Sequence, residues 1–318
     1  MRILVVGKKQ GLRWPETVAE TLAKTDDVSL FLYNKRTLSS ILHKLFCFTK
    51  RYQKDATLLR KKILSFKPDL IFCISCFFIP QSYYDILKQF SHIKKIGWTG
   101  DRFGLAEKEK ATVLDVLFCS DSGFLPTAKQ LGIKAFFLPL CTNDNLFRSF
   151  RGKRTGRPIY VGAGNKIRTT YLQAIQDTCD IWGPHWDQKN LMQHIVHRRT
   201  ISQKKMRRLI CQSKLPFNMH FSTNNIQGLN FRTFDVPATG GLILTNDMAD
   251  LHKCYHVGKE AVTYKTPEEL NQLIHDFLQH PQKYQDIIEA GHHRTIKDHT
   301  FTKRMDEMKS LLKKQRII

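Results

Sequence analysis

Acidic residues are scarce in this sequence. Its 318 residues include 28 Asp and Glu against 51 Lys and Arg, which gives a formal net charge of +23 at pH 7. Such an excess of positive charge favours anionic partners, among them nucleic acids, acidic lipid surfaces and phosphorylated small molecules. The charge alone does not choose among these partners, so the choice depends on local motifs.

Cysteines and long apolar runs are scarce as well. Eight cysteines are too few for a disulfide scaffold, and the C-x-x-C spacing of Cys73 and Cys76 is not completed by a second pair or by histidines into a zinc site. We expect reduced, mostly buried thiols and no bound metal. No stretch approaches the length of a membrane-spanning helix, and the apolar run after Arg2 does not resemble a signal peptide. These features predict a cytoplasmic protein that is open to peripheral contact with the inner face of a membrane.

Short apolar strands alternate with helical stretches along most of the chain. A hydrophobic fraction of 42% supports well-formed cores, and the length is enough for two domains. In the first half we expect strands at residues 2–7, 28–33, 67–75, 95–98, 115–120 and 134–139. Strands that alternate with helices predict an α/β fold with a doubly wound parallel sheet, in which ligands bind at the carboxyl ends of the strands.

Two features of the first half could take part in catalysis or binding. Asp101 follows the expected strand 95–98 and is the best-placed acid for a general base; its alternative role is a structural turn aspartate. The helical segment 44–62 is basic, with Asp55 as its only acid. A solvated helix face is the plainer interpretation, and a surface for an acidic acceptor or a membrane is the alternative.

The second half begins after a basic, glycine-bearing segment, residues 148–157, that has the composition of an interdomain linker. We therefore expect an N-terminal domain over residues 1–150 and a C-terminal domain over residues 158–318. The C-terminal domain is expected to contain strands at residues 159–162, 180–183, 214–220, 242–244 and 260–264. Helical segments at 281–297 and 301–314 end the chain.

The most informative stretch is Gln227-Gly-Leu-Asn-Phe-Arg-Thr-Phe-Asp235, which continues as Val-Pro-Ala-Thr-Gly240. A glycine loop that leads into a helix can place backbone N–H groups against a phosphate. Asp235, within that helix, can accept hydrogen bonds from ligand hydroxyls. A loop that holds phosphate and an acid that holds ribose would suit a sugar nucleotide. The alternative is an ordinary surface loop with a capping role.

Four pieces of the second half resemble, in order and spacing, the CgeB-like (spore-maturation) glycosyltransferases. Residues 159–162 with Arg168 resemble the opening strand and basic residue of that family, and residues 180–186 resemble its Gly-x-x-Trp element. Residues 214–220 resemble its strand ending in Asn-x-His. Residues 228–240 resemble its Gly-x-Asn-x-Arg-x-Phe-Glu-x-x-Ala-x-Gly signature.

The resemblance implies a GT-B fold, in which two Rossmann-like doubly wound domains face a central cleft and the final helix crosses back to the N-terminal domain. It implies transfer of a sugar from a nucleotide-sugar donor, bound by the C-terminal domain, to an acceptor bound by the N-terminal domain. The nucleotide sugar would be a substrate, so no cofactor is expected. The implied donor-binding residues are Gly162, Lys166, Arg168, Gly183, Asn218, Gln227, Gly228, Leu229, Asn230, Arg232 and Asp235.

Two positions depart from the pattern. Asp235 stands where the family usually carries Glu, and Gln227 stands where retaining GT-B enzymes carry the first of two paired glutamates. Gln227 can donate or accept a hydrogen bond with a sugar hydroxyl but has no charge. A catalytically silent, sugar-nucleotide-binding surface-assembly protein is therefore an alternative function.

The reaction is expected to need no metal, because the sequence has no Asp-x-Asp motif of the kind that metal-dependent glycosyltransferases use. Lys166, Arg168 and Arg232, with the amides of Gly228 and Leu229, are the candidates for stabilising the departing diphosphate. The basic N-terminal half would suit an envelope glycan or a lipid-linked acceptor. Nucleic acid is the less favoured partner, since no RRM, KH, zinc-finger or helix-turn-helix signature is visible.

Overall fold

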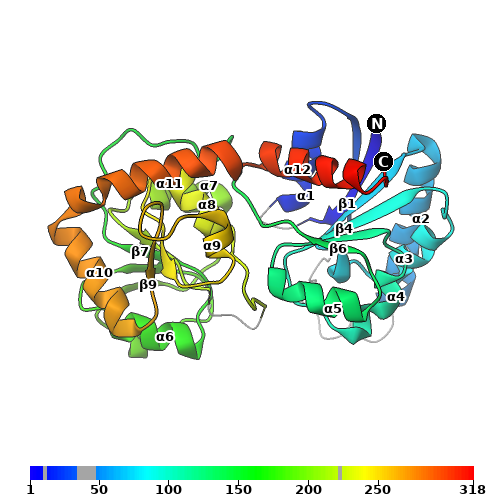
Figure 1. Ribbon diagram of the computed structural model, residues 1–318. Helices are drawn as coiled ribbons and strands as arrows, with labels where there is room; N and C mark the ends of the chain where they lie inside the picture. The colour runs from blue at the N-terminus through cyan, green and yellow to red at the C-terminus, as the bar shows by residue number, and fades with distance from the viewer. Residues whose placement is uncertain (10–12, 34–47, 221–223) are drawn as a thin grey trace. The chain divides into compact units, whose positions relative to one another are not determined.

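The computed structural model describes residues 1–9, 13–33, 48–220 and 224–318 (Figure 1). The chain divides into two compact units, one formed by Met1–Pro139 with Met305–Ile318 and the other by Leu140–Arg304. The first residues of the basic segment 44–62 lie outside the described residues, and its side chains are described only from Ala56 onward.

The first unit is built on a six-stranded parallel sheet with the order β2-β1-β3-β4-β5-β6. Helices connect the strands, as the alternating sequence pattern predicts. The strands are β1 (Arg2–Lys8), β2 (Asp27–Tyr33), β3 (Leu70–Ile74), β4 (Lys94–Thr99), β5 (Val116–Cys119) and β6 (Ala135–Phe137), and the helices are α1 (Trp14–Leu22), α2 (Phe48–Phe66), α3 (Gln81–Lys88), α4 (Lys108–Ala111) and α5 (Leu125–Gln130).

The central strands of this sheet are apolar and buried on both faces. Alternate residues of a strand point to opposite faces, and Leu4 and Val6 accordingly join a core cluster with residues of α2 and α3. The rings of Trp14 in α1 and Trp98 in β4 meet edge to face, with 4.9 Å between centroids. Strands buried on both faces read as continuous apolar runs, which is the pattern seen in the sequence.

The second unit contains a parallel sheet of Rossmann type. Four strands have the order β10-β7-β8-β9, two more form the pair β11-β12, and a parallel bridge between Asn218 and Thr245 joins the two groups. The order is therefore β9-β8-β7-β10-β11-β12. The strands that follow β7 in the chain are added first on one side of it (β8, β9) and then on the other (β10, β11, β12), so the strand order reverses between β7 and β10. The strands are β7 (Ile159–Val161), β8 (Asp180–Trp182), β9 (Ile195–His197), β10 (Pro216–Phe217), β11 (Leu244–Asn246) and β12 (Val262–Tyr264).

Helices pack against this second sheet and form two separate clusters of apolar side chains with it. One cluster includes residues of α6 and α10, and the other includes residues of α7 and α8. Thr266 caps α10 through its side-chain oxygen, which accepts a hydrogen bond from the Glu269 amide. The helices are α6 (Lys166–Gln173), α7 (Gln203–Gln212), α8 (Arg232–Ala238), α9 (Leu251–Cys254), α10 (Pro267–Gln279), α11 (Gln285–Asp298) and α12 (Phe301–Lys314).

Near the start of the second unit, Arg154 contacts the ends of two helices. Its Nη1 donates to the carbonyl of Ile210 (2.6 Å) and its Nη2 donates to the carbonyl of Thr239 (2.7 Å), at the carboxyl ends of α7 and α8. A guanidinium satisfies helix-end carbonyls well. The two units divide between Pro139 and Leu140; the linker that the sequence predicts, residues 148–157, lies a few residues further along the chain.

The end of the chain returns to the first unit. Helix α12 starts in the second unit, and its residues from Met305 onward belong to the first. There, Lys309 forms an ion pair with Asp26 and donates a hydrogen bond to Thr25 Oγ1 at 2.8 Å. Among the helices that the structure describes, none has the length and apolar character needed to cross a membrane.

Candidate functional site

The candidate site lies where the strand order of the second unit reverses. Rossmann-like sheets bind ligands outside the carboxyl ends of the strands at such a point. Here β7 leads into the loop that begins at Gly162, and β10 leads into Asn218 and His220. The polar residues after these two strands therefore share one edge of the sheet.

A hydrogen-bond network ties Asn218 to the start of α8. Asn218 Nδ2 donates to Asn230 Oδ1 (3.0 Å) and to Thr233 Oγ1 (3.1 Å), and Asn230 Nδ2 donates back to Asn218 Oδ1 (3.1 Å). Arg232 Nε donates to the same Asn218 oxygen at 3.3 Å. The hydroxyl of Tyr264 donates to the Asn218 carbonyl at 2.6 Å. The network fixes the first turn of α8 against the end of β10.

His220 belongs to this network and is buried. Its Nε2 lies 2.9 Å from Thr233 Oγ1, and its Nδ1 lies 3.2 Å from Asn246 Oδ1. Burial lowers the pKa of His220 to about 3; the Asn246 contact opposes this shift, and the charges of Arg232 and Arg168 add to it. The imidazole is therefore neutral at physiological pH and adds no charge to the site.

Two glycines bring the loops after β7 and β8 into backbone contact. Gly162 N donates to the carbonyl of Trp182 (2.8 Å), and Trp186 Nε1 donates to the carbonyl of Gly162 (2.9 Å). Gly183 has φ of +149°, and a Cβ at this position would lie 2.0 Å from the Gly162 oxygen. Only glycine fits there, so the Gly-x-x-Trp spacing has a physical basis in how the loops pack.

Arg168 and Arg232 bring two positive charges to this edge. Arg168 is 8% exposed; its Nη1 donates to the Ala163 carbonyl (2.8 Å) and its Nη2 donates to the Met219 carbonyl (3.3 Å). Its Nε and the nearby Tyr160 hydroxyl are buried without a hydrogen-bond partner among the described residues. Burial lowers the pKa of Arg232, and the charge of Arg168 lowers it further. The charge of Arg168 thus acts on Arg232, and two positive charges that interact in this way attract an anion.

Asp235 differs from the expectation of a charged acid open to ligand. It is 2% exposed, and its Oδ1 accepts a hydrogen bond from Thr142 Oγ1 at 2.9 Å. Burial raises the pKa of Asp235 to about 8, although the Thr142 hydrogen bond and the charge of Arg232 oppose the shift. The carboxyl is mostly protonated at neutral pH because Asp235 lies on the buried face of α8.

The remaining donor-site candidates surround the network. Lys166 is the exposed first residue of α6. Gly228 and Leu229 are buried, and the Gly228 carbonyl accepts a hydrogen bond from Asn225 Nδ2 at 3.2 Å. Gln227 is half-buried, and its backbone carbonyl accepts from the amide of Asp250 at 3.1 Å. Residues 222 and 223 of the polar loop before Gln227 lie outside the described residues.

Asp101 lies in the first unit, after β4. Thr99 Oγ1 donates to the Asp101 carbonyl (2.9 Å) and accepts from the Asp101 amide (3.3 Å), and these two hydrogen bonds close the turn. Burial raises the pKa of Asp101 above its usual value. A raised pKa suits a general base, and the turn geometry suits a structural role equally. Its catalytic role therefore stays a prediction.

Sequence reasoning missed several residues of the site. Tyr160 and Thr142 lie within apolar or irregular stretches that carry no recognisable signal. Asn246 ends β11, next to β10, so the rule about carboxyl strand ends could have found it. Within the described residues, no group of three His, Cys, Asp or Glu side chains is arranged to hold a metal ion.

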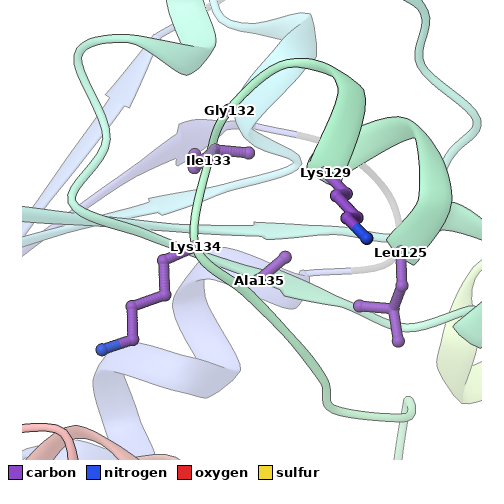
Figure 2. Close-up of a pocket in the computed structure, with 6 residues that line it drawn as sticks. All are labelled: Leu125, Lys129, Gly132, Ile133, Lys134 and Ala135. Carbon is purple, nitrogen blue, oxygen red and sulfur yellow. The ribbon is translucent and has the colours of Figure 1, made fainter.

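A pocket of about 420 Å³ lies elsewhere, beside α5 and β6 of the first unit (Figure 2). It contains none of the predicted site residues. Figure 2 shows that Lys129 and Lys134 point in different directions, so their charges do not converge on one position. The lining residues are Leu125, Lys129, Gly132, Ile133, Lys134 and Ala135.

We expect Gly183→Ala to destabilise the second unit by about 2–3 kcal/mol, because strained backbone and a steric clash add together. Gly258→Ala is the matched control, since Gly258 also has a positive φ, +85°, but has no atom within 4 Å of the added Cβ. Urea unfolding followed by circular dichroism measures both. Equal losses for the two variants would contradict the loop contact.

We expect Asp235→Asn to change the pH dependence of stability. An acid whose pKa is about 8 when folded and 3.8 when exposed keeps its proton longer in the folded state, so stability falls as pH rises between these values. Asparagine does not titrate. The melting temperature of the variant relative to the wild type should therefore rise from pH 5 to pH 8. Parallel profiles would show that the Asp235 carboxyl is not perturbed.

Comparisons with known proteins agree with this architecture. Residues 167–310 match the family model described as "Glycosyl transferase-like". No curated protein sequence matches the chain. Solved structures match along its whole length, although at low sequence identity.

Three of these structures illustrate the likeness. HepE from Anabaena in complex with UDP and glucose has a TM-score of 0.69 at 9% identity, over 99% of this chain and 100% of that one. Sucrose-phosphate synthase from Thermosynechococcus elongatus has a TM-score of 0.68 at 10% identity, over 100% and 99%. The lipopolysaccharide outer core galactosyltransferase WaaB has a TM-score of 0.61 at 14% identity, over 99% and 100%.

At these identities the likeness shows the fold alone, and it confirms the predicted fold class. The chain has the GT-B fold with two Rossmann-like domains, and the match to the glycosyl transferase-like family model covers residues 167–310.

Proposed function

We propose that the protein is a glycosyltransferase that uses a nucleotide-sugar donor and binds the donor diphosphate at the edge formed by Arg168 and Arg232. The observation that carries the proposal is the convergence of these two arginines where the Rossmann strand order reverses. The neighbouring groups do not neutralise them: His220 is uncharged, and burial keeps Asp235 mostly protonated at neutral pH.

The two arginines are assigned different roles. Arg168 binds the carbonyls of Ala163 and Met219, so it positions the loops after β7 and β10 while adding positive charge. Asn218 holds Nε of Arg232, and the Nη groups of Arg232 are assigned to the phosphate oxygens in a bidentate contact. Negative charge that develops on the departing nucleoside diphosphate is then stabilised by groups fixed beforehand.

The donor is proposed to be a UDP-sugar. HepE from Anabaena has been solved in complex with UDP and with UDP-glucose, which makes UDP the first nucleotide to test. The ribose contact implied for Asp235 requires its carboxyl to leave the buried position in which Thr142 holds it. The nearby Asn230 and Gln227 are the alternative partners for sugar hydroxyls.

The acceptor is proposed to be an envelope glycan or a lipid-linked glycan. WaaB, which shares the fold, is a galactosyltransferase of the lipopolysaccharide outer core. The excess of Lys and Arg favours an anionic acceptor. Asp101, with its raised pKa, is the proposed general base that takes the proton of the acceptor hydroxyl. The finer resemblance to CgeB-like enzymes remains part of this proposal.

The donor site is tested most directly with Arg232→Ala. Losing charge-assisted hydrogen bonds costs about 1.5–3 kcal/mol, which corresponds to roughly ten- to a hundredfold weaker UDP binding. Uridine, which has no phosphate, should bind both proteins alike. Titration calorimetry measures both ligands, and Arg208→Ala in α7 is the control for loss of one exposed arginine. Equal weakening for uridine and UDP would refute the diphosphate assignment.

Metal independence is tested with a chelator. Because the arginines are assigned the charge stabilisation that a metal supplies in other enzymes, EDTA should leave hydrolysis of the UDP-sugar, or its transfer, unchanged. Activity that is lost with EDTA and restored by Mn²⁺ would contradict this assignment. Tight UDP-sugar binding without hydrolysis or transfer would favour the alternative function, a catalytically silent sugar-nucleotide-binding protein.

A further inference from the structure

Positive charge is concentrated on α7 and on the turn before it. Between Gln188 and Phe234 the chain has nine Lys and Arg and no Asp or Glu. Arg198, Arg199, Lys204 and Arg208 are exposed, whereas the other two cations of this surface are half-buried. No described acidic side chain forms an ion pair with any of the six. The α7 basic surface is defined as Arg198, Arg199, Lys204, Lys205, Arg207 and Arg208.

The charge pattern of α7 works against the helix that carries it. Lys204 and Lys205 stand in the first turn, where the helix dipole favours acids. Lys204 also lies four residues before Arg208, so two like charges face each other on the helix surface. In α11, by contrast, Arg294 is paired with Asp298 at 2.9 Å. The charge pattern of α7 does not stabilise the helix in the isolated chain. An anionic partner would neutralise these positive charges.

Trp182 joins the end of β9 to the start of α7. The Arg199 Cζ lies 5.3 Å and the Lys205 Nζ lies 5.2 Å from the centroid of the indole ring. Trp182 is itself packed in the core cluster that contains Met206 of α7. These cation–π contacts hold the two cations over one ring, so the turn after β9 and the first turn of α7 form one continuous surface.

An apolar side chain borders this surface. Ile195 is 38% exposed, and it lies on the same face of β9 as His197, because residues two apart in a strand point the same way. His197 stacks on Trp182 with 3.7 Å between ring centroids. Trp182 is buried and therefore offers no platform on which a nucleobase could stack. Clustered cations beside an apolar side chain fit an acidic lipid surface better than single-stranded nucleic acid.

We propose that the α7 basic surface binds the phosphate headgroups of an anionic lipid bilayer. Because β9 ends and α7 begins at the carboxyl edge of the second sheet, the surface starts at the same edge as Asn218 and Arg232. Lipid binding therefore brings the donor-site edge of this unit toward the headgroups. The link to a lipid-linked acceptor rests on the proposed function, whereas lipid binding itself does not.

The test compares two triple charge reversals in the full chain. Arg198→Glu/Lys204→Glu/Arg208→Glu alters the α7 basic surface at exposed positions. Arg60→Glu/Lys61→Glu/Lys88→Glu changes the net charge equally on another surface, where Arg60 Nε donates to Gln89 Oε1 at 3.4 Å and so links α2 to the end of α3. Vesicle flotation is measured with phosphatidylcholine alone and with added phosphatidylglycerol, at low and high salt.

We expect the wild type to float only with vesicles that contain phosphatidylglycerol, and less so at high salt. The α7 triple variant should bind these vesicles at least about tenfold more weakly, since each cation near the surface adds to the attraction, while the α2–α3 variant retains at least half of the wild-type binding. Melting temperature and UDP affinity should be unchanged in both variants, which separates this inference from the donor site.

Several results would overturn the inference. Equal flotation of the α7 variant and the wild type, or greater loss in the α2–α3 variant, would exclude α7 as the lipid surface. Flotation with pure phosphatidylcholine would exclude headgroup charge as the cause. Retarded migration of a single-stranded oligonucleotide, lost in the α7 variant but without flotation of the wild type, would assign the surface to nucleic acid. If glutamates lower the melting temperature, the same comparison is made with glutamines at all six positions.

Discussion

The candidate site depends on one amide side chain, that of Asn218. Its backbone joins the two groups of strands in the second sheet, through the bridge to Thr245, and its side chain holds Asn230 and Arg232. A short strand of two residues precedes it, so the sheet's continuity and the position of α8 rest on the same residue. Removing the Nδ2 or the Oδ1 of Asn218 would leave its buried partners unpaired. Such an unpaired group costs more stability than the hydrogen bond itself contributes.

The electrostatics of the site follow from burial. Two arginines would ordinarily be balanced by nearby carboxylates. Here burial shifts the pKa of Asp235 upward to about 8 and that of His220 downward to about 3, so both groups are mostly uncharged near neutral pH. The same environment that removes charge from the histidine and the acid leaves the guanidinium groups charged, because their pKa values start so high. The net result is a fixed positive edge.

Much of the architecture could be predicted from the sequence, because it is encoded locally. Apolar runs at residues 2–7 and 159–162 identified β1 and β7. The strand β9 was missed, since it has only three residues, Ile195, Val196 and His197, and only the first two are apolar.

The candidate site could be predicted only in part. The positions of Asn218, Asn230 and Arg232 followed from their motif, and the structure brings them into one network. The state of Asp235 could not be foreseen, because it depends on tertiary burial and on a hydrogen bond from Thr142, which lies 93 residues earlier in the chain. Contacts between distant segments decide whether a buried carboxyl is charged. Such contacts have no local signature in the sequence.

The anchoring of Arg154 has a mechanical consequence. Helix α8 spans seven residues, a rod of about 10 Å. At one end stands Arg232, the proposed phosphate ligand, and just past the other end the Thr239 carbonyl is held by Arg154. A displacement of the segment around Arg154 would therefore be transmitted through α8 to Arg232. The segment around Arg154, near the start of the second unit, is thus connected through α8 to the residue proposed to bind phosphate.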